Sequence, residues 1–282
     1  EKKMKRKGFK GILLLFSMLF ALTGCSVSEA TQHGMAVDTI QAEDVLLRVD
    51  FLNVGQADCA LLSTNGHYMV IDGGNNGDAD RILSYLEEQL FPDTFRLWNL
   101  PNVVGTHPHE DHIGSLDAII NHFDVDAVYM PKIMHTSKTF EDVLDAIANK
   151  GLKIKSPSPG DTIDFNGLEI EVLGPQREYK DFNNNSIVLK VNAGETAFLF
   201  TGDAEETAEK DILQAGYDLQ ADVLKVGHHG SSTSSSQAFL QAVKPKYAVI
   251  SVGVGNSYHH PEEEALQRLQ SIGAEIYRTD LQ

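Results

Sequence analysis

The sequence predicts an α/β (α+β) protein in which two β-sheets carry helices on their outer faces. Strands come first and then alternate with helices, and this order occurs twice. Apolar and polar residues alternate over 45–52, and strands 59–62 and 67–71 flank Asn65-Gly66, a dipeptide typical of a hairpin turn. No Pro/Gly-rich linker separates the halves, so we expect one domain over 45–282.

The remaining elements follow from spacing and composition. Ile82, Leu83 and Leu86 have helical spacing within 79–89, and 102–106 is a short apolar strand. The rest of the first half predicts a helix at 115–121, a strand at 127–130 and a helix at 140–149. The second half predicts strands at 162–165, 168–173, 187–191, 196–201, 222–226, 247–252 and 275–277, with helices at 205–215, 237–243 and 262–270. The chain stops just after a strand, which suggests a truncated C-terminus.

Composition excludes several classes of protein. Of 282 residues, 42% are hydrophobic and 22% charged, which is ordinary for a globular chain and unlike a disordered one. Two cysteines cannot build a disulfide scaffold. No apolar run after residue 25 approaches the ~20 residues of a membrane span. The net charge of −17 disfavours long-range attraction to polyanions.

The first 24 residues are expected to be a secretory signal. A lysine-rich head precedes an apolar run over 11–22, and Leu22-Thr23-Gly24-Cys25 resembles a bacterial lipobox. An uncleaved anchor helix is the alternative. Cleavage would remove six basic residues and one acidic residue, so the mature charge would be −22. We then expect a lipidated Cys25, a polar tether over 25–44, and a monomer anchored to the outer side of the bacterial membrane.

The most informative segment is Thr106-His107-Pro108-His109-Glu110-Asp111-His112. It places four potential metal ligands within six positions, directly after an apolar strand. Imidazole and carboxylate together suit zinc, manganese or iron. The alternative is a polar loop with chance histidines, but three of the chain's 11 histidines fall in these six positions. The sequence therefore predicts a metal centre here.

Here the sequence resembles the metallo-β-lactamase superfamily, whose first motif is HxHxDH. Within it, the pattern is most similar to the hydrolase domain of the ComEC competence proteins. Further matching segments are Phe51-Leu52-Asn53-Val54-Gly55-Gln56-Ala57-Asp58, Met69-Val70-Ile71-Asp72-Gly73-Gly74, Leu224-Lys225-Val226-Gly227-His228-His229-Gly230-Ser231 and Tyr258-His259-His260-Pro261. The resemblance implies a four-layer αββα sandwich over nearly all of 45–280 and two divalent metal ions, zinc or manganese.

Carried over residue by residue, the resemblance assigns His107 and His109 to metal site 1 and Asp111 and His112 to site 2. It makes Asp203 the carboxylate that bridges the two ions. Asp203 could instead be the N-cap of the helix at 205–215. His229 is expected as the last ligand of site 2, although the order of His228 and His229 could be reversed.

The sequence departs from many members of the family in one respect. It has no histidine from 136 to 227 to complete site 1, and offers an asparagine-rich segment with Asn183 and Ser186 instead. These two residues are expected to contact substrate. Amide oxygens are weaker zinc ligands than imidazole, so site 1 is expected to be loose, filled by manganese, or empty at low metal concentration.

Two metal ions would favour hydrolysis of a phosphodiester, either nucleic acid or a cell-envelope component. Asp111 would orient the attacking group, and His228 or His260 would donate a hydrogen bond or a proton. Ser231 opens a serine-rich run that is either an anion cradle or a capping loop. Asp58 either orients a metal-binding histidine or ends a turn, and Asp72 is expected to be a turn residue.

Two other functions remain open. The superfamily also hydrolyses lactones, amides and thioesters, but the missing site 1 histidine and the HHGS motif count against a β-lactamase. The incomplete site 1 is also compatible with a lipid-anchored binding protein whose metal site is vestigial.

Overall fold

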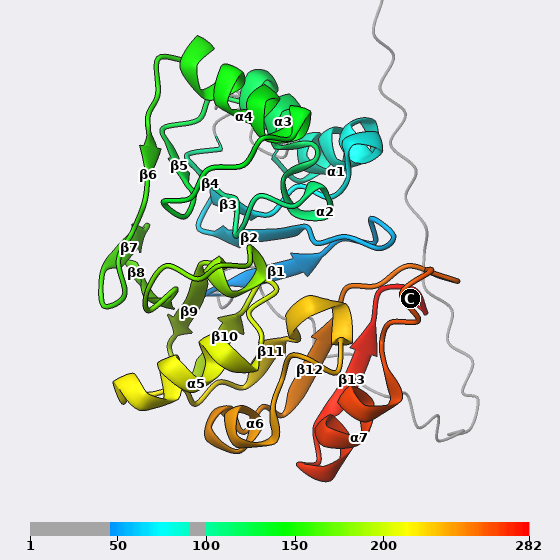
Figure 1. Ribbon diagram of the computed structural model, residues 1–282. Helices are drawn as coiled ribbons and strands as arrows, with labels where there is room; N and C mark the ends of the chain where they lie inside the picture. Colours follow the sequence, from blue (N-terminus) through cyan, green and yellow to red (C-terminus); the bar gives the residue numbers. More distant parts are fainter. Residues whose placement is uncertain (1–45, 91–99, 282) are drawn as a thin grey trace, which may run out of the picture. The chain divides into compact units, whose positions relative to one another are not determined.

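The computed structural model describes residues 46–90 and 100–281. Over these residues it shows two β-sheets packed against each other, with helices on the outer face of each (Figure 1). The strand orders are β1-β2-β3-β4-β5-β6 and β13-β12-β11-β10-β9-β8-β7. The four-layer αββα arrangement predicted from the sequence is confirmed. The predicted signal peptide (1–24) and the tether with Cys25 (25–44) lie outside the described residues.

The first sheet starts antiparallel, through β1, β2 and β3, and continues parallel to β6. Its strands are β1 (Arg48–Phe51), β2 (Ala60–Thr64), β3 (His67–Ile71), β4 (Asn102–Val104), β5 (Ala127–Tyr129) and β6 (Ile154–Lys155). Its helices are α1 (Ala79–Leu90), α2 (Glu110–Ile113), α3 (Leu116–His122) and α4 (Lys138–Asn149). The sequence missed β6, because two residues carry no periodicity.

The second sheet is antiparallel from β7 to β10 and parallel from β10 to β13. Its strands are β7 (Thr162–Phe165), β8 (Leu168–Gly174), β9 (Val188–Ala193), β10 (Thr196–Phe200), β11 (Val223–Lys225), β12 (Tyr247–Ile250) and β13 (Glu275–Arg278). Its helices are α5 (Glu206–Ala215), α6 (Gln237–Val243) and α7 (Glu263–Ser271). No helix within the described ranges is long and apolar enough to cross a membrane.

Three apolar cores hold the four layers together. Successive residues of a strand point to opposite faces, so Val70 and Val103 pack under the helices of the first sheet. Met69 and Val104, their chain neighbours, face the second sheet instead. A third core lies between the second sheet and α5, α6 and α7. Both faces of both sheets are therefore buried, which fixes the strand ends that carry the polar residues described below.

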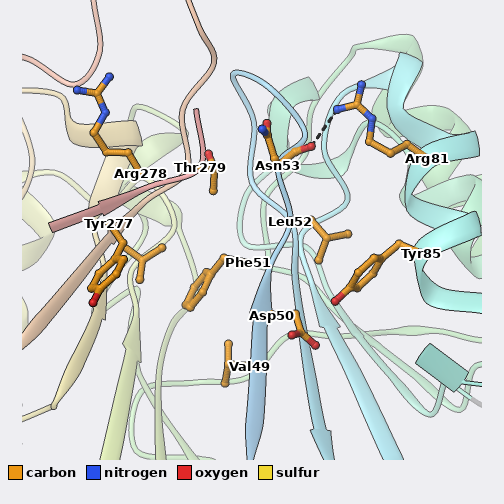
Figure 2. Close-up of a pocket in the computed structure, with 11 residues that line it drawn as sticks. Val49, Asp50, Phe51, Leu52, Asn53, Arg81, Tyr85, Tyr277, Arg278 and Thr279 are labelled. Carbon is orange, nitrogen blue, oxygen red and sulfur yellow. Dashed lines mark hydrogen bonds between the residues drawn. The ribbon is translucent and has the colours of Figure 1, made fainter. Parts of the chain in front are cut away.

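A cavity of about 540 Å³ lies between β1 and β13 (Figure 2). Apolar side chains such as Phe51 and Leu52 line it together with Tyr85, Tyr277 and other residues of these strands and of α1. At its rim Arg81 donates a hydrogen bond of 2.9 Å to the backbone oxygen of Asn53. The bond attaches α1 to the loop that leads to Asp58.

Gly114 is the point at which the histidine segment meets the loop after β3. Its N–H donates to the oxygen of Gly74 at 2.8 Å, and the N–H of Gly73 donates to the oxygen of His112 at 2.6 Å. A Cβ on Gly114 would lie 2.2 Å from the carbonyl carbon of Asn75 and 2.3 Å from the nitrogen of Asn76. Only glycine fits, because the obstructing atoms are backbone.

We therefore predict that Gly114→Ala forces these two segments apart and lowers the free energy of unfolding by at least about 1–3 kcal/mol, the usual cost of overpacking. Thermal unfolding followed by circular dichroism measures the loss. Gly77→Ala is the matched control, because a Cβ there meets nothing within 4 Å. Equal melting temperatures for the two variants would contradict the prediction.

Candidate metal centre

The histidine segment leaves the carboxyl end of β4 and turns into α2. His107 and His112 are fully buried, whereas His109 is partly exposed. The ring centroids of His107 and His112 are 4.1 Å apart, and Nε2 of His107 lies 3.0 Å from Nδ1 of His109. The segment predicted from spacing thus brings its three imidazoles together.

Asp203 follows β10 of the other sheet and reaches the same place. Its side chain is 2% exposed, and Oδ1 lies 3.2 Å from Nε2 of His112. Oδ2 lies 3.8 Å from Nε2 of His107 and 3.9 Å from Nε2 of His229. Glu205 is the N-cap residue of α5, so the alternative interpretation of Asp203 as that cap is wrong.

His228 and His229 follow β11 in a turn, not in the extended chain assumed from the sequence. Both have left-handed backbone, with φ of 50° and 53°, a conformation that costs non-glycine residues free energy and clusters at functional sites. The turn separates the two rings. His229 is buried with Nε2 3.2 Å from Oδ2 of Asp111, whereas His228 is partly exposed beside Glu205 and Thr233.

Four side chains therefore form one compact cluster: Asp111, His112, Asp203 and His229. Each offers a ligand atom, and these atoms all lie within 4.8 Å of one another. Nε2 of His112 and Oδ1 of Asp203 are buried without any hydrogen-bond partner, although they are 3.2 Å apart. Buried polar atoms rarely stay unpartnered. Nitrogen and carboxylate donors left free in this way fit a divalent cation.

The two histidines predicted for site 1 form a pair next to Asp203. Nε2 of His107 lies 3.8 Å from Oδ2 of Asp203 and 3.0 Å from Nδ1 of His109. Ser186, from the asparagine-rich segment, lies on the Nδ1 side of His107, away from His109, and is fully buried. Its hydroxyl lies 3.3 Å from Nδ1 of His107 and accepts the N–H of Asp203 at 3.0 Å. This placement positions two of the candidate ligands and does not fit the expected contact of Ser186 with substrate, since no part of the side chain is open.

Two carboxylates behind the cluster orient its histidines. Oδ2 of Asp72 lies 2.8 Å from Nδ1 of His112, and its other oxygen accepts the N–H of Thr106 at 2.7 Å. Asp72 is therefore more than the turn residue expected from the sequence. Its place at the end of β3, beside the parallel strand β4, was the available signal. Carboxylates that hold a ligand histidine in this way usually affect metal affinity strongly.

Asp58 supports His229 as the sequence analysis allowed. Oδ1 lies 3.3 Å from Nδ1 of His229, whose nearest acceptor is the backbone oxygen of Ser251 at 2.9 Å. Lys225 forms a 2.8 Å ion pair with Oδ2 of Asp58, and both side chains are about 5% exposed. The sequence analysis gave Lys225 no role of its own, because nothing local shows its partner.

Burial and charge pull the pKa values of the cluster in opposite directions. Burial and the neighbouring His112 lower the pKa of His107 well below its ordinary value. Burial also disfavours charged His229, but the carboxylates of Asp203 and Asp58 outweigh it and raise its pKa to about 10. Burial would raise the pKa of Asp203, yet His112 and His229 hold it well below the usual range. Asp203 is thus a carboxylate anion.

The serine-rich run is a tightly bonded loop. Ser231 is 4% exposed, and its hydroxyl and that of Ser232 donate to Oε1 of Glu262. The N–H groups of Ser235 and Ser236 donate to the carboxylate of Glu209 at 2.5 and 2.9 Å. The capping-loop interpretation fits these bonds better than an anion cradle, because glutamates already occupy the donors.

Two further candidates lie beside His228. Nδ2 of Asn183 is 3.5 Å from Nε2 of His228 and 3.3 Å from Glu205. The ring centroid of His260 is 5.5 Å from that of His228, and its Nδ1 lies 3.4 Å from Nε2 of Gln56. His135, to which the sequence assigned no role, packs 6.4 Å from His109 and 4.6 Å from Phe182 between ring centroids. All three lie near the candidate ligands.

An αββα sandwich with a histidine–aspartate cluster at the strand ends defines the class of metallo-hydrolase folds. The chain belongs to the metallo-beta-lactamase superfamily, whose family model matches residues 52–254. It is 32% identical over 245 residues to ComE operon protein 3 of Bacillus subtilis, covering 82% of this chain and 32% of that protein. It is 44% identical over 119 residues to Competence protein ComA of Neisseria gonorrhoeae, covering 42% and 17% respectively.

These matches confirm the resemblance to the hydrolase domain of competence proteins, and they span a third or less of those relatives' length. Among solved structures, the metallo-beta-lactamase fold protein YhfI from Bacillus subtilis aligns with a TM-score of 0.56. The alignment covers 82% of this chain and 95% of YhfI at 10% identity, and therefore supports the fold alone.

We predict that Lys225→Ala destabilises the protein by about 3–5 kcal/mol, because it leaves the buried carboxylate of Asp58 without its cation. Urea unfolding monitored by fluorescence gives the difference. Lys246→Ala is the matched control, since Lys246 forms an ion pair with Asp222 at the exposed surface and its loss should change stability little. Similar losses in both variants would refute a structural role for the buried pair.

The free energy of unfolding should depend on pH through Glu209, which accepts hydrogen bonds from the serine loop. Burial raises the pKa of Glu209 to about 7, although its hydrogen bonds from Ser236 and Ser235 and the nearby Arg268 oppose the shift. Between pH 4.5 and 7 the unfolded chain loses this proton and the folded protein keeps it, so stability falls as pH rises, by up to roughly 3 kcal/mol.

Glu209→Gln should remove this contribution, so that stability changes less between pH 5 and 7 in the variant than in the wild type. Urea unfolding at both pH values measures the difference. Glu206→Gln, an exposed change on the same helix, is the control. A variant with the wild-type pH dependence would show that Glu209 ionises normally in the folded protein.

Proposed function

We propose that this protein is a metal-dependent phosphodiesterase that cleaves nucleic acid or a phosphodiester of the cell envelope. The observation that carries the proposal is the cluster of Asp111, His112, Asp203 and His229 with its unpartnered buried atoms. The similarity to competence proteins supports a substrate related to nucleic acid. We propose two ions, zinc or manganese. The cluster would hold the ion of site 2, and His107 and His109, together with Asp203, would hold the ion of site 1.

Divalent ions held by these residues would polarise the scissile ester and activate water. The chain's own groups would do the rest. Asp203 faces both sets of histidines, and Asp111, whose side chain is 30% exposed, lies at the open side and can orient the attacking group. Asp72 holds the ring of His112, and the backbone oxygen of Ser251, with the charge of Asp58 beside it, holds that of His229.

We propose that His228 acts on the substrate. Its Nδ1 is 3.3 Å from Oε1 of Glu205, and its Nε2 points toward Asp203, 3.8 Å from Oδ2. A histidine held in this way can donate a hydrogen bond to a phosphoryl oxygen or a proton to the leaving group, a role typically worth about 10²–10⁴ in rate. We propose His260, whose ring centroid is 5.5 Å from that of His228, as a second donor, and Asn183, whose Nδ2 is 3.5 Å from Nε2 of His228, as a substrate contact.

We also propose that Cys25 carries a lipid that holds the protein, as a monomer, on the outer side of the membrane. The basic head, the apolar run and the small residues before Cys25 support this location. Mass spectrometry of the N-terminal peptide tests the modification.

The central prediction concerns Asp203. Purified protein with Mn²⁺ or Zn²⁺ should hydrolyse bis-p-nitrophenyl phosphate, and Asp203→Asn should lower kcat more than about a hundredfold by weakening both sets of ligands. Glu141→Gln, an exposed carboxylate change on α4, is the matched control. Elemental analysis should find fewer metal ions in Asp203→Asn than in the wild type.

Three outcomes would contradict the proposal. No metal-dependent turnover of the phosphodiester would exclude a phosphodiesterase. Hydrolysis of nitrocefin or a lactone with phosphodiesters untouched would favour the amide, lactone or thioester hydrolases of the same fold. Retained metal without any turnover would indicate a binding protein with a vestigial centre.

A further inference from the structure

Two segments that carry histidines near the metal centre also carry exposed large apolar side chains. Three large apolar side chains there are strongly exposed: Met134 at 76%, Val254 at 82% and Tyr258 at 66%. Met134 precedes His135, which packs near His109, and Val254 and Tyr258 lie in the loop before His260. Exposed aromatic residues beside a polar site are a frequent mark of ligand contact.

Tyr258 continues a stack of rings that starts at the buried cluster. The ring of His260 lies 6.4 Å from that of His229 with an interplanar angle of 21°, and the ring of Tyr258 lies 5.7 Å from that of His260 at 25°. The side chain of His260 is therefore only 9% exposed. Tyr258 itself is mostly open, so a flat group can stack on it next to the metal centre.

We propose that Tyr258 is a stacking platform for a nucleobase of the substrate, so that the protein acts on single-stranded or short nucleic acid. This inference rests on the proposed phosphodiesterase function. Stacking on an aromatic ring tolerates any base and needs no positive charge. It suits a chain of net charge −17, because a duplex is bound mainly through cationic side chains that contact its phosphates.

A choline group is the main competitor for the same ring, because cations also bind aromatic faces. Glu262, whose Oε1 lies 3.9 Å from Nε2 of His260, does not favour a choline group. Glu262 accepts the N–H of Ser232 at 2.9 Å and its hydroxyl at 3.0 Å, and is thus engaged within the loop. The ring of Tyr258 packs on that of His260 and the residue is mostly exposed, which suits a base stack better than an enclosing aromatic cage.

The experiment compares two esters with the same leaving group, thymidine 5′-(p-nitrophenyl phosphate) and methyl p-nitrophenyl phosphate, with Mn²⁺ present. Tyr258→Ala should raise KM for the thymidine ester about tenfold and leave the methyl ester unchanged. Tyr258→Trp should restore the wild-type KM, because it keeps a stacking surface. Tyr247→Ala is the matched control, since Tyr247 is exposed on β12 and packs near Tyr277.

Equal losses for both esters would overturn the inference, because Tyr258 would then act only by supporting His260. A KM increase confined to p-nitrophenyl phosphocholine would also overturn it and would indicate an envelope substrate. If no ester is hydrolysed, the proposed function fails, and binding still tests the platform. Calorimetric affinity for thymidine 5′-monophosphate with Mn²⁺ should fall in Tyr258→Ala, and an unchanged affinity would overturn the inference.

Discussion

The structure depends on how the buried carboxylate of Asp203 is compensated. An isolated carboxylate in an apolar interior is very costly, and here it lies within 4 Å of nitrogen atoms of His107, His112 and His229. Imidazoles alone compensate incompletely, since Oδ1 remains without a hydrogen-bond partner. A cation is the group that would satisfy Asp203 and the neighbouring ring nitrogens together, so a requirement of stability and a requirement of chemistry coincide at one residue.

The residues around the cluster also help to stabilise the buried charge of Asp203. Asp72 and Asp58 each face the Nδ1 side of a cluster histidine, which leaves its Nε2 directed at Asp203. These carboxylates bring further negative charge into the interior, and Lys225 offsets that of Asp58. The strained backbone of His228 and His229 fits this view, because the bonds of His229 to Ser251 and of His228 to Glu205 hold the turn against its own conformational preference.

The sequence predicted the elements that local patterns specify. The Asn65-Gly66 hairpin, the helices with apolar periodicity and the order of the two sheets are all present, because turn chemistry and amphipathic spacing are local properties. The histidine segment was visible for the same reason. Asp72, Lys225 and Glu209 were not interpreted correctly or at all, since their partners lie 26 to 167 positions away and only the packed sheets bring them together. The sequence also did not show that the buried hydroxyls of Ser231 and Ser186 bond to other residues of the protein, because those partners are distant in the chain as well.

Charge sets how a phosphodiester can approach the centre. A net charge of −17 repels phosphates at long range, but salt screens this repulsion beyond about 10 Å. The repulsion therefore lowers the rate of association more than the affinity of the bound substrate. Within that distance, divalent ions in the cluster would reverse the local sign. A substrate held by one phosphate at the ions then needs a second attachment that carries no charge. The exposed ring of Tyr258 is the group that we propose for that attachment. A long duplex would instead require a track of lysines.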